Sequence, residues 1–535
     1  LSNVNTYAYD GDVTSTLGSL DATVSATGGT AANTMNVNAY GLYNRGYSST
    51  YDASKISQKA VVDVTGTTTL NVSATGGNTG DAEQTVTAYG IMNQADKNDA
   101  TITLDSLDAT VTATAGTVAA TNKNTVEIFA YGLQNTGTNT QAEAASVTVN
   151  QQAVFHVTAD GGKSEATIQG TVVEAYGIQS KLGKISLPAG ADLTVTAKGT
   201  DNEEVDQTMA TGIDFDYAGA AKDASYTAAI TGPVTLTVTA TGGELITTGD
   251  GTQVQATGIS AAIAGDPDAT DINSKLQLTL GDVSGTVKTN TGASTGNDHM
   301  MMEVSALGIY VTGNKDDGST LSATTGNVNL TVTAQNNIAK TFALITALGL
   351  SCGENATLQV QGDAIITAGA TSCNTNDLLV AESLYAVDGG VLNVGTDGQK
   401  SLEKTVQLQG DVMAYNGGKV NLTLDGKDSY LEGNVRRQSY DPEGLLTKTT
   451  TTSGVVNLIV TKGATWRPVY DNRYGSLDTI TEDTVAIPAA TATFADNGIG
   501  TLGLSNGGIV DLTWDNATRD PATEGRTLTI NELSG

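Results

Sequence analysis

The hexapeptide Val86-Thr87-Ala88-Tyr89-Gly90-Ile91 carries the pattern that decides the fold, because related hexapeptides recur along the first two thirds of the chain at intervals of about 35 to 50 residues. The copies that keep the tyrosine occupy residues 37–42, 86–91, 128–133 and 173–178. Those that replace it by Thr or Leu occupy residues 208–213, 254–259, 304–309 and 345–350. Such spacing is typical of a solenoid, in which each repeat adds one rung.

Each hexapeptide has the pattern of a half-buried β-strand. Its apolar first residue, its alanine and its glycine alternate with polar residues and the tyrosine, which gives two faces with a period of two. The last residue is always Ile or Leu, although strict alternation would turn it outward. We therefore expect the chain to bend at Gly90 and its equivalents, so that Ile91 and its equivalents point inward.

Two further strands precede each hexapeptide. One alternates cleanly, as in residues 236–240 (Leu-Thr-Val-Thr-Ala), and ends near paired glycines. The other, as in residues 101–104, is weaker. Three strands per repeat predict an all-β chain that forms a right-handed parallel β-helix, a three-sheet β-solenoid with corner loops. We expect loops after the glycine pairs and directly after the Gly-Ile corner, the latter at residues 43–58, 134–145, 214–225 and 260–274.

The repeat pattern changes twice along the chain. Residues 1–352 have long rungs with decorated loops, and residues 353–460 have shorter β-helix coils. Residues 461–535 differ again and contain both tryptophans of the chain, Trp466 and Trp514. We therefore expect three regions, of which the last is a well-packed C-terminal end.

Composition narrows the class of protein. The chain has 535 residues, 5% aromatic residues and a formal net charge of -31, and its acidic residues are spread through the turns. This charge would repel nucleic acid and anionic lipid, so we expect no nucleic-acid partner. Cys352 and Cys373 are spaced by about one short coil, which leaves open whether they form a disulfide.

The C-terminal region resembles a known family. Its segments are residues 463–466 (Gly-Ala-Thr-Trp), residues 499–512 with Leu and Gly-Gly, and residues 528–535 (Leu-Thr-Ile-Asn-Glu-Leu-Ser-Gly). This series, in this order, is similar to the C-terminal part of pertactin-like passengers of classical (type V) autotransporters. The resemblance implies C-terminal stabilising coils of the autochaperone type. It also implies an outer-membrane β-barrel beyond this fragment and a place on the bacterial cell surface or in the secreted fraction.

Neither histidine is set in a catalytic motif. His156 lies on the outward face of a Thr-rich strand, and His299 lies beside three methionines. The chain lacks the Gly-Asp-Ser-Gly and Gly-Asp-Ser-Leu motifs of serine hydrolases. We therefore expect no enzyme, with polysaccharide cleavage by paired carboxylates as the rival reading. The oxygen-rich segments 266–271 and 315–318 contain no full calcium ligand set, so we expect solvated turns, no metal and no cofactor.

The tyrosines of the hexapeptides are the candidate binding residues. Tyr40, Tyr89, Tyr131 and Tyr176 should point outward on four successive rungs, and Tyr43, Tyr47 and Tyr51 follow the first of them. Such a stripe would suit glycan rings or the apolar surface of a partner. The competing interpretation, which we favour, is stacking between rungs or cover of the tyrosines by the corner loops.

These observations together favour a cell-surface adhesin. We expect multivalent loop and stripe contacts to attach bacteria to a host glycan or matrix protein, or to another cell, and to support biofilm formation and virulence. A second interpretation is self-association of rods from neighbouring cells, which would drive aggregation. The net charge of -31 opposes such association unless salt or ions screen it.

Overall fold

The computed structural model describes most of the chain. The described residues are 1–5, 12–31, 34–46, 59–79, 83–96, 98–117, 125–138, 144–168, 170–203, 206–244, 252–265, 271–293, 300–338, 341–374, 377–436, 454–468, 498–511 and 529–534. Every regular element in these ranges is a β-strand. None of these residues forms a helix long and apolar enough to cross a membrane.

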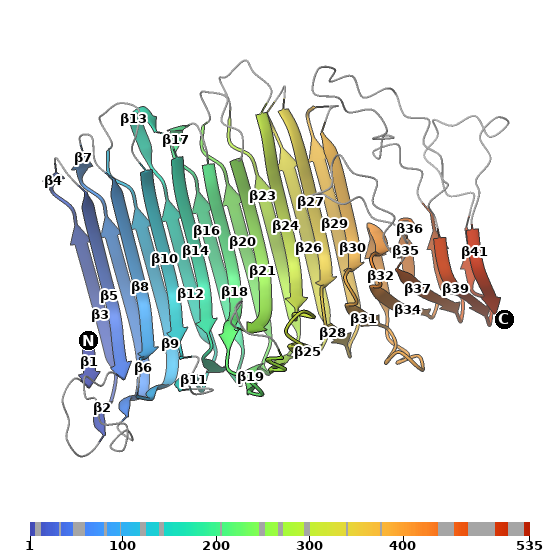
Figure 1. Cartoon of the computed structure of the whole chain (residues 1–535), viewed down its shortest axis with the longest axis horizontal. Coiled ribbons are helices and arrows are strands. Elements are labelled where there is room, and N and C mark those ends of the chain that lie inside the picture. Colours follow the sequence, from blue (N-terminus) through green and yellow to red (C-terminus); the bar gives the residue numbers. More distant parts are fainter. Residues whose placement is uncertain are drawn as a thin grey trace.

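Twelve strands form one continuous parallel sheet, which we call sheet A. It contains the hexapeptides, and its strands follow one another along the molecule from β5 to β36 in Figure 1. In order, its strands are β1 (Ser2–Asn5), β5 (Met35–Gly46), β8 (Gln84–Ala95), β10 (Thr125–Thr136), β14 (Gly170–Lys181), β18 (Asp206–Ala220), β21 (Thr252–Gly265), β24 (Met300–Thr312), β27 (Thr341–Cys352), β30 (Leu378–Ala386), β33 (Asp411–Ala414) and β36 (Val435–Arg436).

The remaining long strands form two further parallel columns. The first contains β2 (Val13–Leu17), β11 (Ala145–Val149), β15 (Lys184–Ser186), β19 (Ser225–Ile230), β22 (Lys275–Leu280), β25 (Thr320–Thr325), β28 (Ala356–Val360), β31 (Val391–Val394), β34 (Lys419–Asp425), β37 (Val455–Thr461), β39 (Gly498–Ser505) and β41 (Thr529–Ser534). The second contains β3 (Leu20–Thr27), β12 (Ala153–Asp160), β16 (Ala191–Lys198), β20 (Val234–Thr241), β23 (Val283–Asn290), β26 (Val328–Asn336), β29 (Ala364–Ser372), β32 (Val406–Gln409), β35 (Tyr430–Glu432), β38 (Thr465–Arg467) and β40 (Ile509–Val510). Strands β6 (Ala60–Thr75) and β9 (Ala100–Thr114) pass through both columns. Short pairs at one corner are β4 (Thr30–Ala31) with β7 (Asn78–Thr79), and β13 (Lys163–Ile168) with β17 (Asp201–Glu203).

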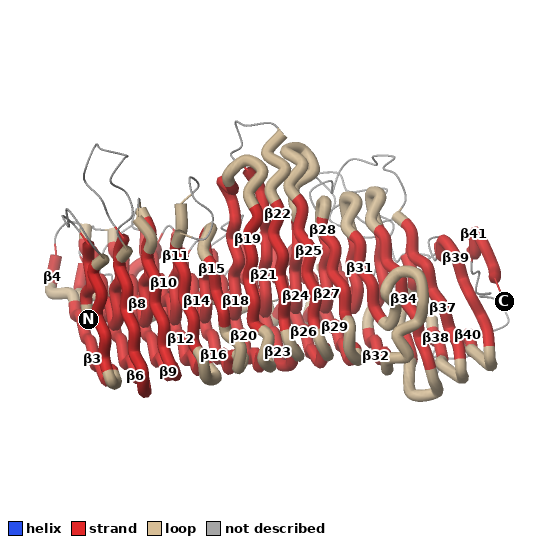
Figure 2. Tube along the Cα trace, turned by 90° about the horizontal axis from the view of Figure 1, so that it is seen from below, coloured by secondary structure: helices blue, strands red, loops and turns tan. Residues whose placement is uncertain are grey.

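The chain visits the three columns in turn, which is the path of a parallel β-helix. Strand β19 of the first column leads to β20 of the second and then to β21 of sheet A, and each pairs with its equivalent in the next coil. Figure 2 shows the coils following one another as a rod. The structure therefore confirms the predicted three-stranded coil.

A column of glycines explains the bend that is repeated along sheet A. In β8 the burial alternates up to Tyr89 apart from the buried Thr87, after which Gly90 and Ile91 are both buried and the alternation resumes in the opposite phase. A Cβ atom built on Gly90 would lie 2.5 Å from the carbonyl oxygen of Gly132 on the next rung. Any side chain here would collide with the neighbouring backbone, so the rungs stack closely only because the position is glycine. The predicted inward turn of Ile91 is confirmed.

The interior of the rod is a set of apolar ladders. In β20 the side chains of Leu236, Val238 and Ala240 are fully buried, and the register stacks them on Leu193, Val195 and Ala197 of the preceding rung. Parallel strands buried in this way lose water from the same apolar positions on every rung. The core therefore grows by repetition rather than by widening.

Our expectation of where the loops after the glycine corner begin was wrong. We expected loops from residue 43 or its equivalents, but strand β5 continues to Gly46, β18 to Ala220 and β21 to Gly265. Main-chain pairing continues in register beyond the bend, for example from Leu42 with Ile91 to Gly46 with Ala95. The bend thus changes which way the side chains face without ending the strand.

The segments that carry the family resemblance lie at the C-terminal end of the rod. Residues of these segments form β38, β39, β40 and β41, which stack on the preceding coils in parallel register. Trp466 of β38 is fully buried, and its indole N–H donates to the carbonyl oxygen of Gly433 at 3.0 Å. A large aromatic side chain fills this core position, where the two preceding coils have Leu431 and Leu408.

Candidate functional site

The four predicted tyrosines form one column on the outer face of sheet A. The register pairs Tyr40 with Tyr89, Tyr89 with Tyr131, and Tyr131 with Tyr176. Successive ring centroids lie 5.0, 5.0 and 5.2 Å apart, and the planes differ by 4° to 8°. We call these four residues the tyrosine column.

The stacking determines what the tyrosine column offers to a ligand. Adjacent rings cover one another's faces, so Tyr89 and Tyr131 have no free π-face on which a sugar ring could stack. Their edges and hydroxyl groups are what remain at the surface, where Tyr89, Tyr131 and Tyr176 are half-buried and Tyr40 is 39% exposed. The favoured interpretation of stacking between rungs agrees with this geometry, whereas ligand binding by the column stays a prediction.

Of the other three candidate tyrosines, only Tyr43 lies within the described residues. The ring of Tyr43 lies 5.6 Å from that of Tyr40 in a tilted arrangement, so it joins the first end of the column. Tyr47 and Tyr51 lie outside the described residues. A residue that the sequence did not single out, Phe129, lies 6.4 Å from Tyr131 and widens the aromatic strip.

Two carboxylates lie beside the far end of the tyrosine column. The hydroxyl of Tyr176 donates to Glu174 at 3.1 Å, and the amide of Gln179 donates to Asp214 at 3.3 Å. Burial raises the pKa of Glu174, and burial together with the charge of Asp216 raises the pKa of Asp214 to about 6. These carboxyl groups therefore hold protons at a higher pH than ordinary surface acids.

Burial also keeps the phenols protonated. It raises the pKa of Tyr89 to about 12, with a smaller effect from Tyr40. The pKa values of Tyr131 and Tyr176 are raised further by burial and by the neighbouring tyrosines and Glu174. The column thus presents neutral hydrogen-bond donors at physiological pH.

A buried asparagine ladder lies three residues after the glycine column, and sequence reasoning missed it. The side-chain amide of Asn44 donates to Asn93 at 2.8 Å, and that of Asn93 donates to Asn135 at 2.8 Å. All three side chains are fully buried, and each amide also donates to backbone carbonyls of the first column. The ladder satisfies polar groups where sheet A turns toward the first column, so its role is structural.

The second column presents a regular polar surface that we call the threonine face. It consists of two outward positions on each of nine strands, which the register aligns into two adjacent rows. One row is Thr23, Asn71, Thr110, His156, Thr194, Thr237, Thr286, Thr331 and Thr367, and the other is Ser25, Ser73, Thr112, Thr158, Thr196, Thr239, Lys288, Thr333 and Gly369. The strands beneath it follow one another along the lower edge of Figure 2.

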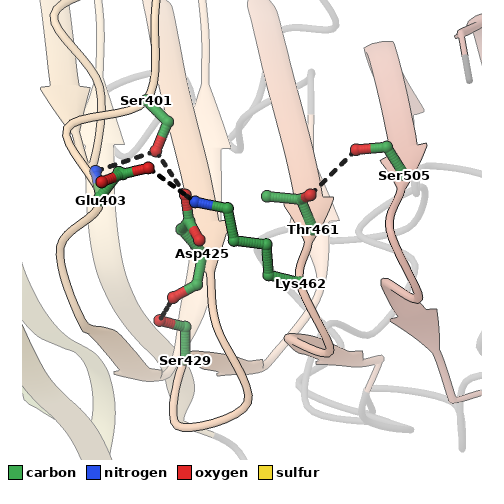
Figure 3. A network of polar contacts seen from close by, with 7 residues as sticks. All are labelled: Ser401, Glu403, Asp425, Ser429, Thr461, Lys462 and Ser505. Atoms are coloured by element: carbon green, nitrogen blue, oxygen red, sulfur yellow. Dashed lines mark hydrogen bonds and ion pairs between the residues drawn. The ribbon is translucent and has the colours of Figure 1, made fainter.

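A polar network ties three successive coils together near the C-terminal end (Figure 3). The ammonium of Lys462 lies 2.9 Å from Glu403 and 3.1 Å from Asp425. The hydroxyl of Ser401 donates to the Asp425 carboxylate at 2.7 Å, and that of Ser429 donates to the Asp425 backbone oxygen at 2.7 Å. Because these contacts connect turns of different coils, they hold corners in place rather than form a reactive centre.

The histidines and the oxygen-rich segments were the remaining candidates for a catalytic or metal site. His156 is exposed on the threonine face as predicted, and His299 lies outside the described residues. Asp317 is buried rather than solvated, because its carboxylate accepts backbone N–H groups of Ser319 at 2.7 Å and Gly265 at 2.5 Å. Burial opposes its ionisation, but these hydrogen bonds outweigh burial and lower its pKa.

The two cysteines, whose pairing the sequence left open, are both free thiols, with Cys352 buried and Cys373 exposed. Among the described residues, no group of three His, Cys, Asp or Glu side chains is placed to hold a metal ion. Of the oxygen-rich segment 266–271, residues 266–270 lie outside the described part of the chain.

Comparison with known proteins gives no relative. No protein-family model, curated protein or solved structure matches the chain.

Proposed function

We propose that this chain is the surface-exposed passenger of an autotransporter and that it acts as an adhesin. The rod would attach the bacterium to a host glycan, a matrix protein or another cell, and so contribute to biofilm formation and virulence. Secretion or anchoring through an outer-membrane β-barrel belongs to the same proposal. Its support is the C-terminal series of Trp, Gly-Gly and Leu-Thr-Ile-Asn segments.

One observation carries the adhesin proposal, namely that equivalent outward residues repeat in register from coil to coil. The threonine face repeats over nine strands, and the tyrosine column repeats over four. A ligand that contacts one rung weakly can contact its neighbours at the same time, which raises the effective concentration for each further contact. Attachment by many weak contacts needs no deep pocket.

Polysaccharide cleavage remains the rival proposal of another class. Glu174 and Asp214, on neighbouring strands, are the carboxyl groups whose raised pKa values would suit acid catalysis. Glu174, however, accepts a hydrogen bond from Tyr176, and Asp214 accepts one from Gln179. Both groups are therefore held by neighbouring side chains, which favours a structural role.

Attachment is tested by displaying the chain on a non-adherent bacterium. Binding to a panel of host glycans and matrix proteins, biofilm mass and clumping would be scored with and without calcium. Selective binding to a panel member, or clumping of displaying cells, supports the adhesin. If displaying cells match the empty strain in every assay, the adhesin proposal is wrong, and release of reducing sugar from polysaccharides becomes the next measurement.

A further inference from the structure

The tyrosine column repeats at a regular interval along the rod. Its ring centroids follow one another at 5.0, 5.0 and 5.2 Å on strands β5, β8, β10 and β14, which lie next to one another in Figure 1. The register does not shift between these strands, so each tyrosine occupies the same place on its rung. The column therefore presents one phenol group at each step along the rod.

The phenol groups are ordered by the protein itself. The ring of Tyr89 lies between those of Tyr40 and Tyr131, with interplanar angles of 4° and 8°. At the far end of the column, the hydroxyl of Tyr176 donates to Glu174 at 3.1 Å. Side chains that are already ordered lose little conformational entropy when a ligand binds. A ligand that meets several of these tyrosines at once therefore keeps most of the free energy of each contact.

The charges around the column disfavour an anionic ligand. Its four strands contain two glutamates, one arginine and one lysine. Both cations stand next to carboxylates, because Arg45 forms an ion pair with Asp96 and Lys181 is the register partner of Asp216. The whole chain has a net charge of -31. Sulfated glycans and polyuronates would therefore be repelled, and an uncharged ligand would not.

An uncharged glycan with β-1,4 linkages has a matching repeat. In its extended form, the pyranose rings follow one another at nearly the interval of the tyrosine rings. Each pyranose ring carries hydroxyl groups along its edges, and a phenol hydroxyl can both donate to them and accept from them. Burial raises the pKa of Tyr89 to about 12, so its phenol remains a donor at neutral pH. Because the ring faces are covered by stacking, contact is made by hydroxyl groups and ring edges.

We propose that the tyrosine column binds an extended, uncharged β-1,4-linked glycan that runs along the rod with one sugar at each tyrosine. This site goes beyond the proposed attachment, because it assigns one class of ligand to four particular coils. Contacts of this kind make affinity depend on the length of the glycan, since two sugars reach two tyrosines and four sugars reach all four. An α-1,4-linked chain coils and cannot follow the straight column.

The first test measures binding of soluble oligosaccharides to the full chain by isothermal titration calorimetry. The probes are β-1,4-linked oligomers of glucose and of N-acetylglucosamine. Affinity should rise with each added sugar from two to four and then level off. An α-1,4-linked glucose hexamer and a sulfated glycan of the same length should bind weaker by about tenfold or more.

Variants of the column give a second readout. Tyr89→Phe and Tyr131→Phe keep the stacked rings and remove one hydroxyl each. Each variant should bind the β-1,4-linked tetramer about three- to tenfold more weakly, which corresponds to one lost hydrogen bond. Tyr310→Phe is the matched control, because Tyr310 is a half-buried tyrosine of sheet A outside the column, and its affinity should be unchanged. Far-ultraviolet circular dichroism establishes that each variant is folded.

The inference is overturned if no β-1,4-linked oligomer binds, or if affinity does not depend on length. It is also overturned if the α-1,4-linked or sulfated glycan binds equally well, or if Tyr89→Phe binds the tetramer as the wild type does. Attachment of displaying cells is scored separately. Cells that attach to the host panel while no oligomer binds would refute the glycan site and leave the adhesin proposal standing. Oligomer binding that Tyr89→Phe weakens, on cells that attach to nothing, would support the site and refute the adhesin.

Discussion

Replacing Asn93 by Ala should destabilise the coils around it more than a surface change would. Asn93 is fully buried, donates to Asn135 at 2.8 Å and to the carbonyl of Ala100 at 3.0 Å, and accepts from Asn44 at 2.8 Å. Truncation leaves these groups buried with fewer hydrogen-bond partners, at about 1–3 kcal/mol for each group left unsatisfied. Because Asn44 keeps its bond to the carbonyl of Ala60, we expect a loss of about 2–4 kcal/mol.

The loss should be local, since a solenoid coil contacts only its neighbours. Native-state hydrogen exchange is the suitable assay, because a repeat protein of this length does not unfold in one step. The opening free energy of amides in β8, β9 and β10 should fall by about 2–4 kcal/mol, while that of β26 and β29 stays unchanged. Asn38→Ala is the matched control, because Asn38 is exposed on β5 and its loss should change stability by less than about 0.5 kcal/mol.

The prediction is wrong if the β8 amides exchange equally slowly in the Asn93→Ala and Asn38→Ala variants. It also fails if exchange accelerates uniformly along the rod, since the coils would then unfold as one unit rather than as coupled neighbours. Either result would mean that the ladder does not stabilise the bend of sheet A.

Three further predictions concern Gly90, Asp214 and the two cysteines. Gly90→Ala should cost about 1–3 kcal/mol by forcing the rungs apart, which chemical unfolding of the variant measures against wild type. Folding raises the pKa of the Asp214 carboxyl group from 3.8 to about 6, so the folded state loses stability as the pH rises through that range and the buried group ionises. Asp214→Asn should therefore be more stable than wild type at pH 7 by up to about 3 kcal/mol, and equally stable below pH 3.8. Chemical unfolding at the two pH values measures this difference. A thiol reagent should label exposed Cys373 promptly and leave Cys352, whose pKa burial raises to about 12, unlabelled in the native chain, as mass spectrometry would show.

Much of the fold could be predicted because the same physics recurs on every rung. The alternation in Leu236-Thr237-Val238-Thr239-Ala240 repeats often enough to exclude chance, and three strands per repeat require a solenoid. The prediction that was wrong concerned one local feature, the residue at which the loop after each glycine begins. The sequence shows a phase change at Gly90, but whether the strand ends there depends on backbone pairing with the next rung, which no single repeat reveals.

In the candidate site, too, the direction of side chains could be predicted from the sequence, whereas contacts between rungs could not. Outward placement of Tyr89 follows from alternation, but stacking at 5.0 Å needs equal register between rungs, and this register removes the ring faces from the surface. Asn93 follows the glycine of its hexapeptide by three residues, as Asn44 and Asn135 follow theirs, and it was overlooked because a loop was expected there. The threonine face was visible as alternation alone, and its two continuous rows emerge only when the strands are aligned.

The most direct test of the account is adhesion as a function of the number of coils. Ala191 and Val234 are register partners, as are Val234 and Val283, so removal of residues 191–233, or of residues 191–282, joins equivalent positions and deletes one or two coils. Surface display of each variant is verified with an antibody, and detachment force is measured on single cells. Attachment by repeated contacts predicts a stepwise fall in force with each coil removed. Unchanged force, or complete loss when one particular coil is removed, would contradict the account by locating function at a single site.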